Sequence, residues 1–273
     1  MRLLVSKLEH SRCSRNCKRK KELKEMLKLF GKVIVLVLAV SLITGVVYAA
    51  DVTTGMVGYW ALDGNAKDKS GKGNDGTAVG NPQWVNGRVG QAVKLDGKTQ
   101  LIDIPGFKLT TDTATFAVWI NGWKTDTWTG IMMSRSTTSD GIGFGDNDAL
   151  HYTWNADSTW QWHLGPVIPK DKWVMVAVAV DPKLATAYTF TDTDGLKSAV
   201  NQANHLSETI DKLQLGNDNC CGLTRWFTGM IDEAVIYKRA LTKDDIVELA
   251  TKGLTTAVES SGKLAVTWAG LKK

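Results

Sequence analysis

FTGMIDEAVIYKRAL, residues Phe227–Leu241, is the most informative part of this sequence for the fold. Apolar side chains fill both of its alternating faces, except at the adjacent acids Asp232 and Glu233. Because a strand that is apolar on both faces is covered on both sides, we expect it inside a sheet, with the acidic pair at its mouth. Thr242 and Asp245 follow at the spacing of a capping box, so a short helix is predicted directly after the strand.

Short β-rich runs separated by Gly, Asn and Asp clusters extend outward from this stretch and predict thirteen strands between residues 57 and 237. In Trp173–Asp181, WVMVAVAVD, valines alternate with Met175, Ala177 and Ala179. We expect the valines in a core between two sheets and the smaller residues where another element packs closely. The pattern predicts one all-β domain over residues 50–250, a two-sheet jelly-roll sandwich with one short C-terminal helix.

The leader differs from the rest of the chain. The 273 residues hold 33 Lys+Arg and 28 Asp+Glu; the first 50 hold 11 and 3, which leaves 22 and 25 in the remainder. The net charge of +5 therefore belongs to the leader and does not indicate a nucleic-acid partner. The apolar run Val33–Val47 has the length of a secretory signal, shorter than a membrane span of about 20 residues.

We predict that residues 1–49 are a signal-peptide helix with a long basic n-region, cleaved after Ala49, and that the true start is Met26. The protein is then secreted, periplasmic or at the cell surface. An uncleaved leader that anchors the protein in the membrane is the alternative.

Cysteine usage fits an exported chain. Cys13 and Cys17 lie in the leader, and only the adjacent Cys220 and Cys221 follow it. Two neighbouring cysteines with no other internal partner either form a vicinal disulfide or keep two thiols. We predict the vicinal disulfide, which either stiffens the turn before the closing strand or presents a rigid apolar plate to a ligand.

Several motifs carry a family resemblance. They are VGYWALD (Val57–Asp63), DKSGKGNDGT (Asp68–Thr77), GQAVKLDG (Gly90–Gly97), TFAVWIN (Thr115–Asn121), KWVMVAVAVD (Lys172–Asp181) and the closing stretch. Together they resemble the LamG-like jelly-roll domains of bacterial secreted proteins, in the concanavalin A-like lectin/glucanase group. The resemblance covers residues 52 to 250 and implies a carbohydrate-binding or adhesive module. The same architecture also hosts glycosidases and lyases, so function must be argued from the site.

The carboxylates argue against catalysis. Glycoside hydrolysis needs two positioned carboxylates, which glucanases of this fold place close together on one strand. The glutamates after the leader are Glu208, Glu233, Glu248 and Glu259, and none lies in a Glu-x-Asp-x-x-Glu arrangement. His151 and His163 have no Ser, Cys or Tyr in a recognisable nucleophile setting. We therefore expect no enzyme activity.

Aromatic residues favour carbohydrate binding. All 11 tryptophans follow the leader, and flat rings stack on the C–H face of a pyranose while polar side chains bond its hydroxyls. The predicted carbohydrate-binding residues are Trp123, Trp128, Tyr152, Trp154, Trp160, Trp162, His163 and Arg135. Each ring can instead fill the core, which is what we expect of Trp60, Trp119, Trp173 and Trp226.

A structural calcium ion is the expected cofactor. Calcium takes six to eight oxygen ligands, and an acidic loop follows the first predicted strand. Its predicted ligands are Asp63, Asp68, Asp75 and Asp232, which meet if the first and last strands are neighbours. Domains that resemble this one often hold such an ion, but the same loop sequences also form turns without one. The partner of Asp232 is thus either a cation or a backbone turn.

The sequence predicts a secreted, non-catalytic carbohydrate-binding module whose partner is a glycan. A protein-interaction or adhesion domain without sugar specificity, whose partner is a surface protein, is the alternative. Residues 251–273 are expected to form a tail or an edge strand.

Overall fold

The computed structural model describes residues 24, 26, 28, 51–135, 139–154, 162, 164–220 and 223–254. Lys24, Met26 and Lys28 are helical, and no helix in these ranges is long and apolar enough to cross a membrane. The strands described below belong to the unit Ala50–Lys273. The predicted cleavage site, the predicted strand around Trp160 and the tail beyond Leu254 lie outside the described residues.

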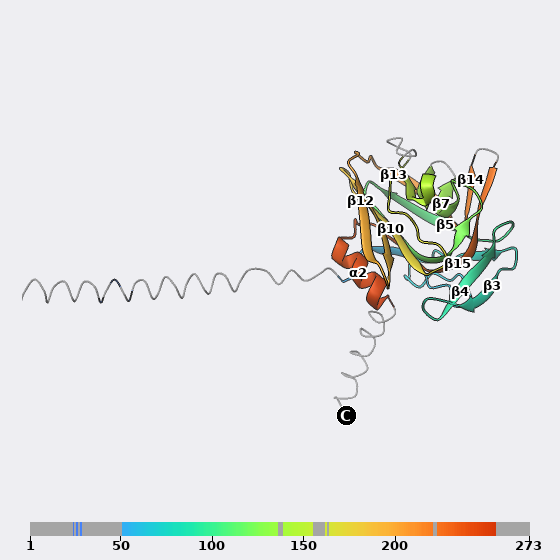
Figure 1. Ribbon diagram of the computed structural model, residues 1–273, viewed down its shortest axis with the longest axis horizontal. Helices are drawn as coiled ribbons and strands as arrows, with labels where there is room; N and C mark the ends of the chain where they lie inside the picture. Colours follow the sequence, from blue (N-terminus) through green and yellow to red (C-terminus); the bar gives the residue numbers. More distant parts are fainter. Residues whose placement is uncertain are drawn as a thin grey trace, which may run out of the picture. The chain divides into compact units, whose positions relative to one another are not determined.

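Two antiparallel sheets form the domain (Figure 1). The larger runs β12-β11-β10-β6-β15-β4-β3, with β1 and β14 also paired to β15. Its strands are β1 (Met56–Trp60), β3 (Gln83–Asn86), β4 (Gln91–Asp96), β6 (Ala114–Lys124), β10 (Val174–Val180), β11 (Ala185–Thr191), β12 (Gly195–Asn201), β14 (Asn217–Cys220) and β15 (Leu223–Tyr237).

The smaller sheet runs β2-β5-β13-β7-β8-β9. Its strands are β2 (Thr77–Val79), β5 (Leu101–Thr111), β13 (Glu208–Leu215), β7 (Gly130–Arg135), β8 (Ser139–Phe144) and β9 (Leu150–Thr153), with the 3-10 turn η1 (Asp146–Asp148) between the last two. The predicted all-β two-sheet sandwich is confirmed.

Strand β10 shows how the sequence builds two cores. Val174, Val176, Val178 and Val180 are buried in the cluster between the sheets, together with residues of the smaller sheet such as Ile210. Each fully buried valine stabilises the fold by roughly 1.5 kcal/mol or more. The alternation predicted from the sequence is confirmed.

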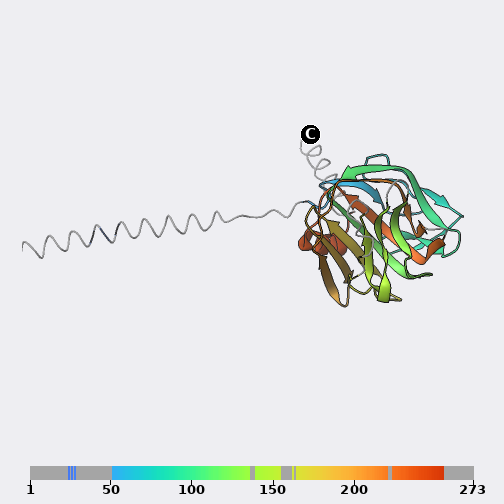
Figure 2. The same cartoon turned by 90° about the horizontal axis from the view of Figure 1, so that it is seen from above.

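The opposite face of β10 meets a helix. Met175, Ala177 and Ala179 share a second buried cluster with Ile246 and Leu249 of α2 (Lys243–Lys252). Figure 2 shows the red α2 beside the orange strands of this sheet, as Figure 1 does. Small residues on β10 thus leave room for the helix.

Helix α2 begins with the predicted capping box. The Thr242 side chain accepts a hydrogen bond from the Asp245 backbone N–H, and the Asp245 side chain accepts one from the Thr242 N–H. This reciprocal arrangement satisfies two donors that helix starts leave open.

Strand β15 closes the sandwich. It pairs with β6 along one side, and with β4 and then β1 along the other. Tyr59 of β1 lies opposite Val235, so the end of the domain does meet its beginning, as predicted. The predicted position of the acidic pair is wrong: Asp232 and Glu233 are buried within β15, at an irregularity where the φ angle of Glu233 is 50°.

Candidate carbohydrate-binding surface

Two of the predicted sugar-binding aromatics lie in the core. Tyr152 is 1% exposed and Trp154 is fully buried. The Asn201 amide donates to the Tyr152 hydroxyl over 2.8 Å, and Trp154 Nε1 donates to the Leu206 carbonyl over 2.8 Å. The two side chains share a face, as their spacing indicates, but this face points between the sheets. The assignment of Tyr152 and Trp154 to a sugar is therefore wrong.

Two other tryptophans are half-buried around His151. The Trp128 ring meets the His151 ring edge to face at 5.1 Å between centroids. His151 Nδ1 lies 2.7 Å from the Trp162 carbonyl oxygen, so this nitrogen is the donor. The Trp162 ring rests 5.2 Å from the ring of buried Tyr152. The structure thus links Trp128 and Trp162 through one buried histidine, which the sequence did not single out for this role.

One glycine of β8 positions Trp128. Gly143 lies opposite His151, and a Cβ added to Gly143 would stand 2.5 Å from the Thr129 carbonyl oxygen. The same carbonyl accepts a 2.8 Å hydrogen bond from the Phe144 N–H. Because Gly143 has no side chain, the segment holding Trp128 and Thr129 lies directly on the strand, which places the indole against His151.

The Trp123 ring contacts an aromatic side chain and a lysine. Its half-buried ring packs edge to face on Phe144 at 5.4 Å, and Lys170 Nζ lies 5.3 Å from the ring centroid. Such a cation over an indole is attractive. Trp123 therefore supports the core of the sandwich and has its face partly covered by a lysine.

Arg135 holds a strand pair together. Its Nε and Nη2 donate to the two carboxylate oxygens of buried Asp218 over 2.6 and 3.0 Å, and it also contacts the Ser139 hydroxyl. Arg225 Nη1 donates to the same carboxylate over 3.3 Å. A bidentate pair with a buried carboxylate is a strong structural contact, so the guanidinium assigned to sugar hydroxyls joins β7 to β14 instead.

Three of the predicted site residues cannot be placed, and a fourth is adjacent to one of them in the sequence. Trp160, His163 and Cys221 lie outside the described residues. Cys220 is disulfide-bonded. The vicinal disulfide and the roles of Trp160 and His163 stay predictions.

The acidic loop after β1 is built on its own backbone. The Asp68 carboxylate accepts hydrogen bonds from the N–H groups of Tyr59, Ser70 and Asn74. Asp75 accepts from the Asp68 N–H over 3.0 Å and pairs with Lys67 over 2.6 Å. These oxygens therefore already have donors directed at them.

Asp63 and Asp232 hold the turn between β3 and β4. Asp63 Oδ1 accepts from the Gln91 N–H over 2.9 Å, and its Oδ2 pairs with Lys69. Asp232 Oδ2 accepts from Arg88 N–H at 2.8 Å and Val89 N–H at 3.0 Å. A Cβ added to Gly90 of this turn would stand 2.3 Å from Asp63 Oδ1.

These contacts do not fit a calcium shell. Backbone N–H groups and lysines, rather than open space, face the four carboxylates, and calcium needs six to eight free oxygen ligands. No three His, Cys, Asp or Glu gather as a metal site in the part of the chain that the structure describes. Asp232 contacts a backbone turn, and we propose no metal here.

The neighbouring Glu233 is buried against Tyr59. The Tyr59 hydroxyl donates to both carboxylate oxygens, at 3.0 and 2.9 Å. Burial raises the pKa of Asp232 to about 7 and that of Glu233 to about 7. Burial also raises the pKa of Tyr59, so the hydroxyl stays a donor.

Comparison with known families identifies the fold group. Residues 96–247 match a family described as the "Concanavalin A-like lectin/glucanases superfamily". The chain belongs to this superfamily. No curated protein is significantly similar to it in sequence.

Solved structures share the superfamily's architecture. Domain 4 of AbnA, an extracellular GH43 arabinanase of Geobacillus stearothermophilus in complex with arabinotriose, has a TM-score of 0.57 and 21% identity, covering 72% of this chain and 98% of that one. The binding domain of botulinum neurotoxin DC in complex with SialylT has a TM-score of 0.53 and 13% identity, covering 72% and 51%. For the binding domain of Paraclostridial Mosquitocidal Protein 1 the values are 0.52, 15%, 72% and 52%.

Identities this low show the fold alone. The chain spans nearly the whole arabinanase domain but only about half of each toxin chain. The arabinanase domain is in complex with arabinotriose, the two toxin structures are binding domains, and the superfamily's description covers both lectins and glucanases.

Proposed function

We propose that the domain is a secreted, non-catalytic carbohydrate-binding module. The observation that carries the proposal is the pair of half-buried indoles of Trp128 and Trp162. The Trp128 ring packs on His151, and the Trp162 ring packs on Tyr152 while its backbone carbonyl accepts a hydrogen bond from His151. A ring held in place before binding loses little conformational freedom when a sugar stacks on it. The superfamily and the arabinotriose bound to the similar arabinanase domain support a sugar as ligand.

The described carboxylates support a binding rather than a catalytic role. A glycosidase places two carboxyl groups on either side of an accessible bond. Glu208 and Glu233 are buried, the latter under Tyr59, and Glu248 lies on α2 in a 3.1 Å ion pair with Lys252. None of these three glutamates is placed to act on a bound glycan.

A protein-interaction domain is the second candidate, and exposed apolar side chains near β9 favour it. Leu164, Val167 and Leu206 are 72%, 59% and 62% exposed. Val167 forms a β-bridge with Ala149 beside β9, and the Leu206 carbonyl binds Trp154 just after it. Exposed apolar groups gathered around one strand are typical of protein interfaces.

A glycan array on the purified protein separates the two functions. We expect neutral oligosaccharides, arabinotriose among them, to bind, and binding to weaken in Trp128→Ala and Trp162→Ala. Absence of any bound glycan, together with a protein ligand whose binding is lost in Leu164→Ser and Leu206→Ser, would favour the interaction domain.

A further inference from the structure

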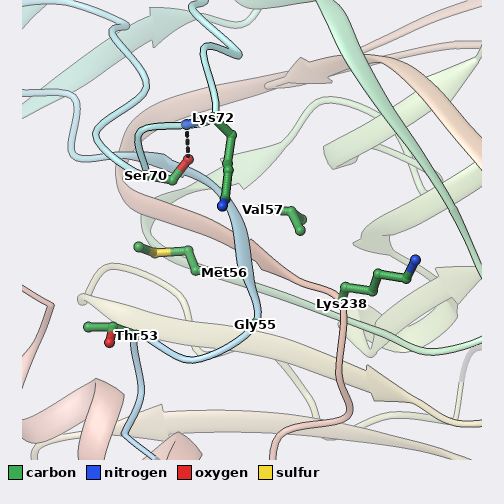
Figure 3. A pocket seen from close by; sticks show the side chains of 7 residues that line it. All are labelled: Thr53, Gly55, Met56, Val57, Ser70, Lys72 and Lys238. Carbon is green, nitrogen blue, oxygen red and sulfur yellow. Dashed lines mark hydrogen bonds between the residues drawn. The ribbon is translucent and has the colours of Figure 1, made fainter.

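A pocket of about 430 Å³ opens where β1 begins (Figure 3). Its lining comes from β1, from the loop that follows Asp68 and from the end of β15. The residues that matter are Thr53, Met56, Val57, Ser70, Lys72 and Lys238. None of these residues belongs to the aromatic group around His151. The volume of the pocket falls in the range of small-molecule sites, about 300 to 1,000 Å³.

Two cations line this pocket without a carboxylate. Basic side chains around it are paired: Lys67 with Asp75 at 2.6 Å, Lys69 with Asp63 at 2.9 Å, and Arg239 with Asp245 at 2.9 Å. Lys72 and Lys238 have no ion pair or side-chain hydrogen bond among the residues that the structure describes.

The acids nearest to Lys72 along the chain do not pair with it. Asp75 pairs with Lys67 at 2.6 Å, and Asp68 is bound by backbone N–H groups. Its carboxylate oxygens accept hydrogen bonds from the N–H groups of Tyr59, Ser70 and Asn74. Lys72 and Lys238 therefore bring two positive charges, and no carboxylate, to the lining of the pocket.

The backbone around these lysines is fixed. The Lys238 N–H donates to the Gly55 carbonyl over 2.8 Å, and the Lys72 N–H donates to the Ser70 hydroxyl over 3.3 Å. Gly55 has a φ of 78°, and a Cβ there would lie 3.2 Å from Arg239 Cδ. The backbone N–H groups of both lysines are therefore hydrogen-bonded within the lining of the pocket.

Three kinds of group meet in the pocket. Figure 3 shows the Lys72 side chain directed from its loop toward Met56 and Val57, with the hydroxyls of Thr53 and Ser70 in the same lining. An apolar patch suits the C–H face of a sugar ring, hydroxyls suit its hydroxyls, and ammonium groups suit a carboxylate or sulfate.

We infer that this pocket binds an acidic sugar unit, one that carries a carboxylate or a sulfate. It is a second site, separate from the aromatic surface, and it adds an anionic ligand class to the proposed function. A membrane surface is less suited to it, because recognition of anionic lipids uses clusters of about four to eight basic residues and the pocket supplies two.

The test is calorimetric titration of the purified protein at low salt with three probes. They are trigalacturonate, which carries carboxylates, a chondroitin sulfate tetrasaccharide, which also carries sulfates, and neutral arabinotriose. The variants are Lys72→Gln, Lys238→Gln and the double variant. Lys108→Gln, an exposed lysine of β5 in the other sheet, is the charge-matched control.

At least one acidic probe should bind wild type and Lys108→Gln equally. Each pocket variant should bind it about threefold more weakly and the double variant about tenfold, the size of partly exposed ionic contacts. Arabinotriose binding should not change in any lysine variant. Preference for trigalacturonate or for the sulfated probe would identify the acid group.

Three results would overturn the inference. They are binding of neither acidic probe, acidic-probe binding that is equal in wild type and the double variant, and lysine-dependent binding to phosphatidylserine vesicles without binding of either acidic sugar. Arabinotriose binding that is unchanged in Trp162→Ala would count against the proposed function alone, so the two failures are distinguishable. Because both lysines are exposed, unchanged melting temperatures should verify that the variants fold.

Discussion

The Asp232 carboxylate accepts a 2.8 Å hydrogen bond from the backbone N–H of Arg88, a residue 144 positions earlier in the chain. The same oxygen accepts from Val89, and Oδ1 accepts from the N–H of Glu233. One buried side chain thus fixes the closing strand β15 to the turn between β3 and β4. The role of Asp232 in the described structure is therefore to hold these two segments together.

Asp232→Ala should lower the free energy of unfolding by about 3 kcal/mol or more, because it leaves three backbone donors without their acceptor. Urea unfolding followed by tryptophan fluorescence measures the change. Asp112→Ala, an exposed acid between β5 and β6, is the control and should change stability by less than about 0.5 kcal/mol. A loss below about 1 kcal/mol in Asp232→Ala would contradict this role.

Chelation should leave the domain unaffected. Since N–H groups and lysines occupy the oxygens of Asp63, Asp68, Asp75 and Asp232, EDTA should shift the melting temperature by less than about 1 °C. A thermal melt with and without EDTA makes the comparison. A clear fall with EDTA that added calcium reverses would show that these carboxylates hold an ion.

Stability should fall as the pH rises from 5 to 8. The pKa values of Asp232 and Glu233 are raised from 3.8 and 4.5 to about 7, so the folded state binds more protons than the unfolded state between these values. Stability is therefore fully present below the ordinary pKa values and is lost as the pH passes about 7.

Glu233→Gln isolates one of the two groups. It should flatten the pH dependence of the unfolding free energy by about 1 to 3 kcal/mol between pH 5 and 8, since each pKa unit corresponds to about 1.4 kcal/mol. Glu248→Gln on α2 should keep the wild-type slope. An unchanged slope in Glu233→Gln would mean that the carboxyl is ionised throughout this range.

Gly143→Ala should disturb the aromatic surface through the backbone. The added methyl group meets the Thr129 carbonyl at 2.5 Å, so we expect a stability loss of about 2 kcal/mol and weaker glycan binding as Trp128 moves. Gly106→Ala is the matched control, because nothing lies within 4 Å of a Cβ there. Equal stability and equal glycan binding in both variants would contradict the close approach.

The fold could be predicted from local pattern because its central elements are long and periodic. The alternation in β10, the two-sided apolar β15 and the Thr242 cap each follow from a few neighbouring residues. The sequence pattern does not predict strands β2, β3 and β14, because they have only three or four residues and include polar positions such as those of QWVN. Pairing with neighbouring strands, rather than their own sequence, makes them strands.

The candidate site was harder to predict because periodicity tells which side chains share a face but not what covers it. Tyr152 and Trp154 share a face, yet it is the buried one. The same difficulty holds for the acids, because the sequence does not tell whether Asp232 contacts an ion or a turn. The turn can approach Asp232 because Gly87 has no side chain: a Cβ there would stand 2.6 Å from Asp232 Oδ2. The contact of Arg135 with Asp218 joins residues 83 apart and left no local signal.

Calorimetric titration with the strongest neutral ligand from the glycan array tests whether the Trp128 and Trp162 surface binds a sugar. We compare wild type with Trp162→Ala and with Trp173→Ala, a half-buried tryptophan packed against the second core near α2. We predict binding about tenfold weaker in Trp162→Ala, from the loss of one stacked ring, and unchanged binding in Trp173→Ala. Equal affinity of wild type and Trp162→Ala, with both variants folded, would contradict it.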